Sequence, residues 1–124
     1  MTTQRANSRP AGGTVSPIAV VQAAIERCLE TEAALLCRTD MNDRQRADRA
    51  MKLSQVADDA ATWWAVLAGH VYDRPADLPS VFGVAAIAGK RQAESSARFW
   101  AETAQFWQDR ANGRARDDDA GSAA

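Results

Sequence analysis

Residues 42–71 read NDRQRADRAMKLSQVADDAATWWAVLAGHV. Apolar and small side chains recur there at intervals of three and four, which is typical of a long amphipathic helix. Asn42, with Gln45 three positions later, resembles a capping box and predicts where this helix begins. Residues 73–79, DRPADLP, contain two prolines and predict the loop that ends it. The stripe consists of Ala50, Leu53, Ala57, Ala60, Trp64, Leu67 and Val71.

A shorter helix is expected before this one. Ser16 is a good capping residue and Pro17 suits the first helical position, so the helix should begin there. Residues 1–16 are polar and rich in Gly, Pro and Thr. They cannot bury enough apolar surface to offset the entropy of ordering, which predicts a disordered tail.

A third helix is expected after the loop, from about Ser80 to a C-terminal cap at Asn112-Gly113. Gly83 and Gly89 lie in its first turns, and glycine disfavours helix interiors. A separate short helix before Gly89 is therefore an alternative.

These elements predict an all-α fold. Short connections make consecutive helices antiparallel neighbours, so residues 17–112 should form an antiparallel bundle of three long helices, or four if a short helix precedes Gly89. Residues 113–124 are charged and then small, and we expect them to form a disordered charged tail.

Antiparallel alignment about the 73–79 loop places large side chains opposite small ones. Such matching lets two helices approach closely and fill the core. The alignment predicts two contacts of this kind: Trp64 against Ala85, Ala88 or Gly89, and Trp100 against Ala50 or Leu53.

The sequence contains 124 residues, which suits a single domain. Cys28 and Cys37 are separated by roughly 13 Å of helical rise and point to opposite faces, so they are not expected to form a disulfide. Cys28 is predicted to be a small core residue and Cys37 an exposed thiol. Since no apolar run suits a signal peptide or a membrane span, we expect a cytoplasmic protein without membrane contact.

No motif in the sequence specifies a reaction. A glycine-rich phosphate loop, CxxC and GxSxG are all missing, and His70 is the single histidine. Glu32 lies among the apolar residues of the first predicted helix, where a buried carboxylate could bind a metal. The chain has no Glu-x-x-His motif, however, which a di-iron site would need. An ion pair of Glu32 with Arg46 or Arg49 is the favoured interpretation. We therefore expect no enzyme, catalytic residue, metal or cofactor.

Residues 98–111 contain a local repeat, RFWAETA followed by QFWQDRA. The heptad spacing keeps both aromatic pairs on one side of a helix. The third helix has its own apolar stripe, and Trp100 and Trp107 lie within it. They are expected in the core, although an aromatic platform for bases or a partner is the alternative. Phe99 and Phe106 lie on its flank and are predicted to contact a partner.

Unequal helix lengths predict a second partner surface. The first helix is about eight residues shorter than the others, so they should overhang it by roughly 10 Å at the 73–79 loop. Unless the N-terminal tail covers it, an apolar patch remains there for a partner protein or a second copy. The predicted interface residues are Val66, Val71, Tyr72, Val81 and Phe82, together with Phe99 and Phe106.

The net charge of −1 conceals an uneven distribution. Residues 38–52 carry five basic and three acidic side chains, and residues 90–116 carry six basic and three acidic ones. The antiparallel arrangement brings the start of the second helix and the end of the third to one basic end. Such an end can hold a nucleic-acid backbone. A solvated surface with scattered ion pairs is the alternative, because Arg and Asp alternate in DRQRADR.

As a short, Ala- and Arg-rich helical bundle with a basic end, the chain over residues 17–112 resembles the small subunits of Cascade-like CRISPR effector complexes. The resemblance lies in architecture and charge, without a diagnostic motif. It implies a non-catalytic subunit that contacts RNA or single-stranded DNA without sequence specificity, beside partner subunits and further copies of itself. A protein–protein adaptor or assembly bundle without a nucleic-acid role is the alternative. The implied phosphate contacts are Arg46, Arg49, Lys52, Arg98, Arg110 and Arg114.

Overall fold

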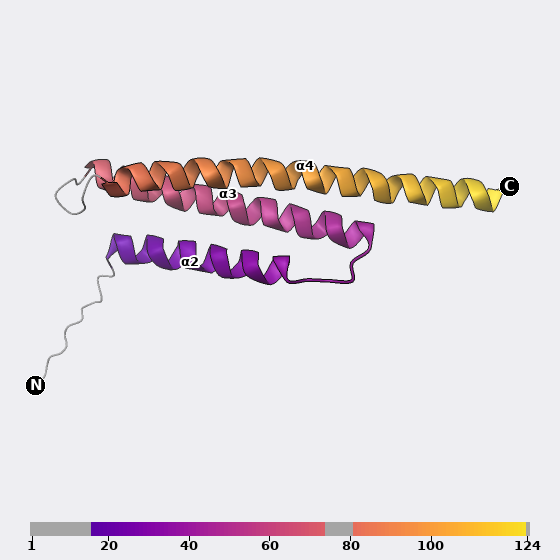
Figure 1. Ribbon diagram of the computed structural model, residues 1–124, viewed down its shortest axis with the longest axis horizontal. Coiled ribbons are helices and arrows are strands. Elements are labelled where there is room, and N and C mark those ends of the chain that lie inside the picture. The colour runs from indigo at the N-terminus through magenta and orange to yellow at the C-terminus, as the bar shows by residue number, and fades with distance from the viewer. Residues whose placement is uncertain (1–15, 74–80, 124) are drawn as a thin grey trace, which may run out of the picture.

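The computed structural model describes residues 16–73 and 81–123, which form three helices and no strand. These are α2 (Pro17–Leu36), α3 (Asp43–Asp73) and α4 (Val81–Ala123). Consecutive helices run antiparallel (Figure 1), so the predicted all-α bundle of three long helices is confirmed. Because α4 is continuous, the alternative with a short helix before Gly89 is wrong. The expectation of disorder before Ser16 falls outside the described residues.

The two predicted helix starts are observed. At α3, the amide of Gln45 donates to Oδ1 of Asn42 at 2.8 Å, and the amide of Asn42 donates to Oε1 of Gln45 at 2.9 Å. These reciprocal bonds form the predicted capping box. Pro17 occupies the first turn of α2, although the Ser16 side chain makes no capping hydrogen bond.

The interface between α3 and α4 consists mainly of alanine. Small side chains let the two backbones approach closely, and the Ser54 hydroxyl donates to the carbonyl of Ala97 at 2.9 Å across the interface. Leu53 is the largest side chain that is fully buried in the described residues. The buried alanines are Ala47, Ala50, Ala57 and Ala61 on α3, and Ala86, Ala93, Ala97 and Ala104 on α4.

Trp64 on α3 lies directly against Gly89 on α4, as the alignment predicted. A Cβ atom at Gly89 would be 2.6 Å from Cδ2 of Trp64, so the indole ring occupies the space a side chain would need. Trp100 is half-buried and its ring packs edge-on against Phe99. The predicted contact of Trp100 with Ala50 or Leu53 remains a prediction.

The first helix of the bundle packs on one neighbour only. Val21 and Ala24 are the buried residues of α2, and its backbone lies near α3, whereas no Cα atom of α2 comes within 8 Å of a Cα atom of α4. The backbones of α2 and α4 are therefore far enough apart that only side chains lie between them. Figure 1 shows α2 as the outlying helix beside the closely paired α3 and α4.

The overhang lies at the opposite end from the one predicted. α2 begins beside the end of the bundle where α3 stops, and it ends well before the level at which α3 starts (Figure 1). The reason is the connection over residues 37–42, which is not helical and carries the chain onward along the bundle, with Asp40 at a φ of 55°. The uncovered ends are thus the start of α3 and the second half of α4.

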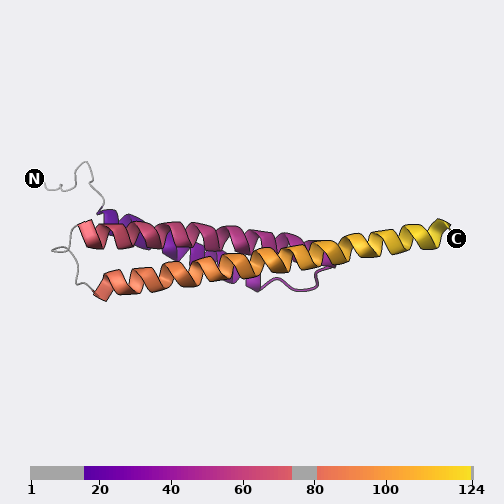
Figure 2. The ribbon, with the colours of Figure 1, turned by 90° about the horizontal axis from the view of Figure 1, so that it is seen from above.

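The predicted helix end at Gly113 is also wrong, because α4 continues to Ala123 and residues 113–123 are helical rather than a disordered tail. Figure 2 shows this part of α4 projecting beyond the other helices. A glycine within a helix costs only about 1 kcal/mol. The surrounding Ala and Arg residues favour helix, and Arg114 is held by a contact with α3, so the helix passes through Gly113.

Candidate binding surfaces

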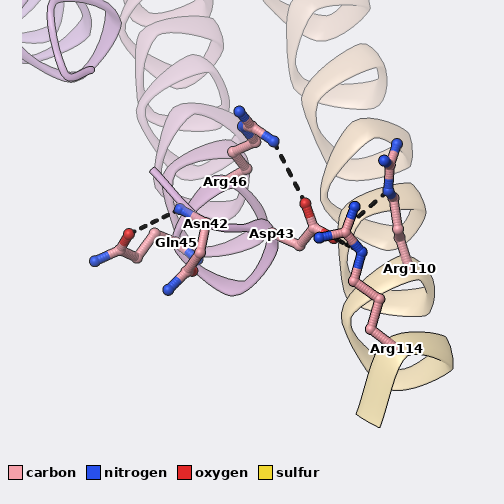
Figure 3. A network of polar contacts seen from close by, with 6 residues as sticks. All are labelled: Asn42, Asp43, Gln45, Arg46, Arg110 and Arg114. Carbon is pink, nitrogen blue, oxygen red and sulfur yellow. Dashed lines mark hydrogen bonds and ion pairs between the residues drawn. The ribbon is translucent and has the colours of Figure 1, made fainter. Parts of the chain in front are cut away.

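The basic end of the bundle is organised around one buried carboxylate. Asp43 is the first residue of α3 and only 6% of its side chain is exposed. Arg46 lies one turn later on α3, while Arg110 and Arg114 lie one turn apart on α4 (Figure 3). Their guanidinium nitrogens reach the Asp43 carboxylate at 3.4, 3.5 and 3.1 Å, respectively. We call these four residues the Asp43 cluster.

The Asp43 cluster has more positive than negative charge. Nε of Arg110 and Nε of Arg114 both approach Oδ2, but neither contact has the geometry of a hydrogen bond, so the attraction is chiefly electrostatic. The side chains of Arg46, Arg110 and Arg114 are 40%, 47% and 62% exposed. One carboxylate therefore holds three partly solvated guanidinium groups, and the surplus charge faces water.

Trp107 supports two of these arginines. The guanidinium carbon of Arg46 lies 4.8 Å from the centre of the indole ring, and that of Arg110 lies 5.4 Å from it. Cation–π contacts of this kind stabilise by about 0.5–1 kcal/mol each at exposed sites. Trp107 is half-buried, so the expected core residue is partly a platform for the arginine side chains.

The other three predicted phosphate contacts lie outside the Asp43 cluster. Lys52 pairs with Asp48 at 3.0 Å, and the exposed Arg98 donates to the Ser95 hydroxyl at 3.5 Å. Arg49 is half-buried, with its Nε atom buried and without a hydrogen-bond acceptor. The structure thus brings Arg46, Arg110 and Arg114 together and leaves the rest dispersed.

The predicted ion pair of Glu32 with Arg46 or Arg49 is wrong. No ion pair or hydrogen bond joins these described residues, and Glu32 instead lines a cavity with Gln92 and Ser96 of α4. The extended 37–42 connection accounts for this, because it shifts α2 away from the start of α3. The carboxylate that the arginines contact is Asp43, which the charge alternation of DRQRADR gave no reason to single out.

An apolar groove runs between α2 and α4, with α3 as its floor. It consists of two adjoining cavities of about 310 and 510 Å³, which share Ile25 and Trp64 as lining residues. Leu29 stands on the α2 wall with 59% of its surface exposed, and Phe82 stands exposed on the α4 wall. The remaining lining residues are Ile18, Val21, Gln22, Glu26, Cys28, Glu32, Val56, Ala57, Ala60, Leu67, Ala85, Gly89, Gln92, Ala93 and Ser96.

The charged side chains that line this α2–α4 groove are both acidic, Glu26 and Glu32. Cys28 also lines it, and burial raises the pKa of its thiol, with a further contribution from the negative charge of Asp59. The neutral thiol is therefore favoured, and Cys28 is half-buried rather than a fully buried core residue. As predicted, both cysteines are free and Cys37 is exposed.

Most of the predicted partner residues are at the surface. Phe99 and Phe106 are 58% and 57% exposed, and each packs edge-on against the tryptophan that follows it. Val71 is the exception, because it is buried with 2% exposure. The side chain of Val71 packs against Gly83 of α4, where the absence of a side chain lets the two helices approach closely. The assignment of Val71 to a partner surface is therefore wrong. The other exposed members are Val66, Tyr72, Val81 and Phe82.

No group of three His, Cys, Asp or Glu side chains is arranged to hold a metal ion within residues 16–73 and 81–123. None of the helices in those residues combines the length and apolarity needed to cross a membrane. Comparison of the chain with protein-family models, curated proteins and solved structures finds no match in any of the three.

Proposed function

We propose that this protein is a non-catalytic assembly subunit that receives an amphipathic helix of a partner protein in the α2–α4 groove. The observation that carries the proposal is the one-sided packing of α2, which rests on α3 and leaves its other apolar flank facing the groove. Recognition of a helix in an apolar groove relies on such a surface. A guest helix would remove the exposed part of Leu29 from water.

The groove also indicates what kind of helix fits. Its floor and walls are apolar over the shared residues Ile25 and Trp64, so the guest needs an apolar stripe at intervals of three and four. Glu26 and Glu32 supply the charge along the groove. A basic residue near one end of the stripe would therefore be favoured over an acidic one.

Leu29→Glu tests this proposal, because it places a charge at the groove without disturbing a buried residue. Burial of an unpaired carboxylate is strongly unfavourable, and we expect partner affinity to fall by about 100-fold or more. Val20→Glu is the matched control, since Val20 is also exposed on α2 but does not line the groove. A photo-crosslinking residue at position 29 identifies the partner, and titration against the purified partner measures the affinity.

Equal affinities of the two variants would contradict the proposal. So would crosslinking that is as strong from position 20 as from position 29, because the groove would then have no special role.

A second candidate function is contact with a nucleic-acid backbone, and the Asp43 cluster favours it. Three arginines around one carboxylate leave positive charge that phosphates would neutralise. This agrees with the resemblance to Cascade-like small subunits, in which such contact occurs within an assembly. So few phosphate contacts would give the isolated protein a Kd of roughly 10⁻⁴–10⁻⁶ M at physiological salt.

The test of this second function is a salt series with the double variant Arg46→Gln and Arg114→Gln, which removes two arginines of the Asp43 cluster and leaves Arg110 beside Asp43. Loss of two phosphate contacts should weaken binding to all sequences alike and reduce the slope of log K against log salt by about 1.4–1.8. Lys90→Gln with Arg91→Gln removes the same charge far from the Asp43 cluster and should leave the slope unchanged. Undetectable binding of the wild-type protein at low salt, alone and in its assembly, would exclude this function.

A further inference from the structure

We propose that the helix received by the α2–α4 groove is α4 of a second copy of this chain, packed antiparallel to the first. The inference rests on the proposed function and names its partner. It comes from a stripe of α4 that faces the groove and the solvent over most of its length and meets α3 at Gly89, against Trp64, and at Arg110, beside Asp43.

This stripe, the α4 seam, advances by alternating steps of four and three residues, which is the spacing of a coiled-coil contact. It is distinct from the alanines of α4 that are buried against α3, such as Ala93 and Ala97. Its first half lines the groove and its second half carries the two exposed phenylalanines. The seam consists of Ala85, Gly89, Gln92, Ser96, Phe99, Thr103, Phe106 and Arg110.

The two halves of the α4 seam are complementary in size. The seam residues Ala85, Gly89, Gln92 and Ser96 are small or polar, whereas Phe99 and Phe106 are bulky. In an antiparallel coiled coil the two kinds of seam position face each other, and the alignment we favour places each ring opposite a small residue. Phe99 then faces the partner's Ser96, and Phe106 faces the partner's Gly89.

The alignment shifted by one heptad toward the C-terminus of α4 fits less well. Sliding the helices by one heptad places Gly89 opposite the partner's Gly113, which leaves two residues without side chains face to face. The favoured alignment instead puts Phe106 over the ring of Trp64, which already covers Gly89. Aromatic pairs of this kind contribute about 0.5–1.5 kcal/mol beyond the area they bury.

The charges agree with the same alignment. Arg110 comes opposite the partner's Ala85, and in each copy Ala85 lines the same cavity as Glu26. The part of the Arg110 side chain that Asp43 leaves exposed therefore faces a cavity with an acidic wall, and twofold symmetry repeats this arrangement. On the flank of the seam, Glu102 falls opposite the partner's Ser95, so no acid faces another acid there.

The phenylalanine rings supply up to about a third of the area that a stable dimer interface buries. The four phenylalanine rings of two copies would remove on the order of 400 Å² from water. Specific interfaces bury roughly 1,200–2,000 Å² in total, and the groove walls at Leu29 and Phe82 add to the area that the rings supply. The shortness of α2 leaves the second half of α4 free to enter the groove of the other copy.

The test is sedimentation of the full chain over a range of concentrations. The wild-type protein should be a dimer at micromolar concentration, and Phe106→Glu should raise the dimer Kd by at least about 100-fold, because it buries a charge. Val84→Glu is the control, since Val84 is exposed on α4 but lies off the seam. A monomeric wild-type protein, or equal effects of the two variants, would overturn the inference.

The relative direction of the two α4 helices in the dimer is measured separately, from the distance between two spin labels. In a Cys28→Ala, Cys37→Ser background with Asp109→Cys, the antiparallel alignment separates the two labelled positions by roughly 35 Å along the helix axis. A parallel pair would bring them close together, which would overturn the proposed arrangement. A monomeric protein whose position 29 still crosslinks to another protein would refute the second copy and leave the proposed function standing, whereas failure of both experiments would refute both.

Discussion

Replacement of Gly89 by leucine should destabilise the protein by roughly 1–3 kcal/mol, the usual cost of overpacking a well-filled interface. The site has no room for a side chain. A Cβ atom there would lie 2.6, 2.7 and 3.0 Å from Cδ2, Cε2 and Cε3 of Trp64, all of which belong to a rigid ring system. The ring must move, or the two helices must separate.

Urea denaturation followed by circular dichroism measures this effect. Gly69→Leu is the matched control, because Gly69 lies within α3 and a Cβ atom there would meet nothing within 4 Å. Leucine favours helix over glycine by roughly 1 kcal/mol, so the control should be as stable as the wild type or more so. If both variants unfolded at the wild-type urea concentration, Trp64 would not lie against Gly89 in solution.

The contact between Trp64 and Gly89 was predictable because it depends on local signals. The three-to-four spacing of the stripe fixes which face of each helix is buried, and the two prolines of the 73–79 loop fix where the chain reverses. Residues at similar distances from that loop then come together. The capping box at Asn42 was predictable for the same reason, since all its atoms lie within one turn.

The position of α2 was not predictable in this way. Its distance along the bundle depends on the path of residues 37–42, and a sequence of that length can fold back tightly or run extended. The 37–42 connection continues along the bundle before α3 begins. This path places the overhang at the opposite end from the predicted one and separates Glu32 from Arg46 and Arg49. The burial of Val71 was missed because Gly83 was considered as a helix breaker rather than as a site of close approach.

The importance of Asp43 was also hidden in the sequence. Its contacts with Arg110 and Arg114 join residues far apart in the chain, and the contact with Arg114 forms because α4 continues past Gly113. The alternation of charges around Asp43 predicted local pairs with solvent-exposed partners. One such pair, Lys52 with Asp48, does form on the surface of α3.

Asp43→Ala is expected to be the most damaging change at the basic end, at about 2 kcal/mol. Removal of one partner of a fully buried ion pair costs about 3–5 kcal/mol, but water partly solvates the three arginines and reduces the loss. The first turn of α3 also loses an acidic residue that favours the helix dipole, which costs about 0.3–1 kcal/mol. Urea denaturation gives the total change in the free energy of unfolding.

Two controls separate the Asp43 cluster from a general charge effect. Asp48→Ala makes the same charge change on the same helix, but the Asp48–Lys52 pair is exposed, so it should cost less than about 1 kcal/mol. Arg114→Ala should also cost less than about 1 kcal/mol, because its side chain is mostly solvated and Arg46 and Arg110 still neutralise Asp43. In Asp43→Ala, hydrogen exchange of the α4 amides beyond Arg110 should be faster than in the wild-type protein. In Asp48→Ala it should match the wild-type rate. Equal costs for the two aspartate variants would mean that Asp43 is no more than a surface charge, and the last turns of α4 would need another explanation for their order.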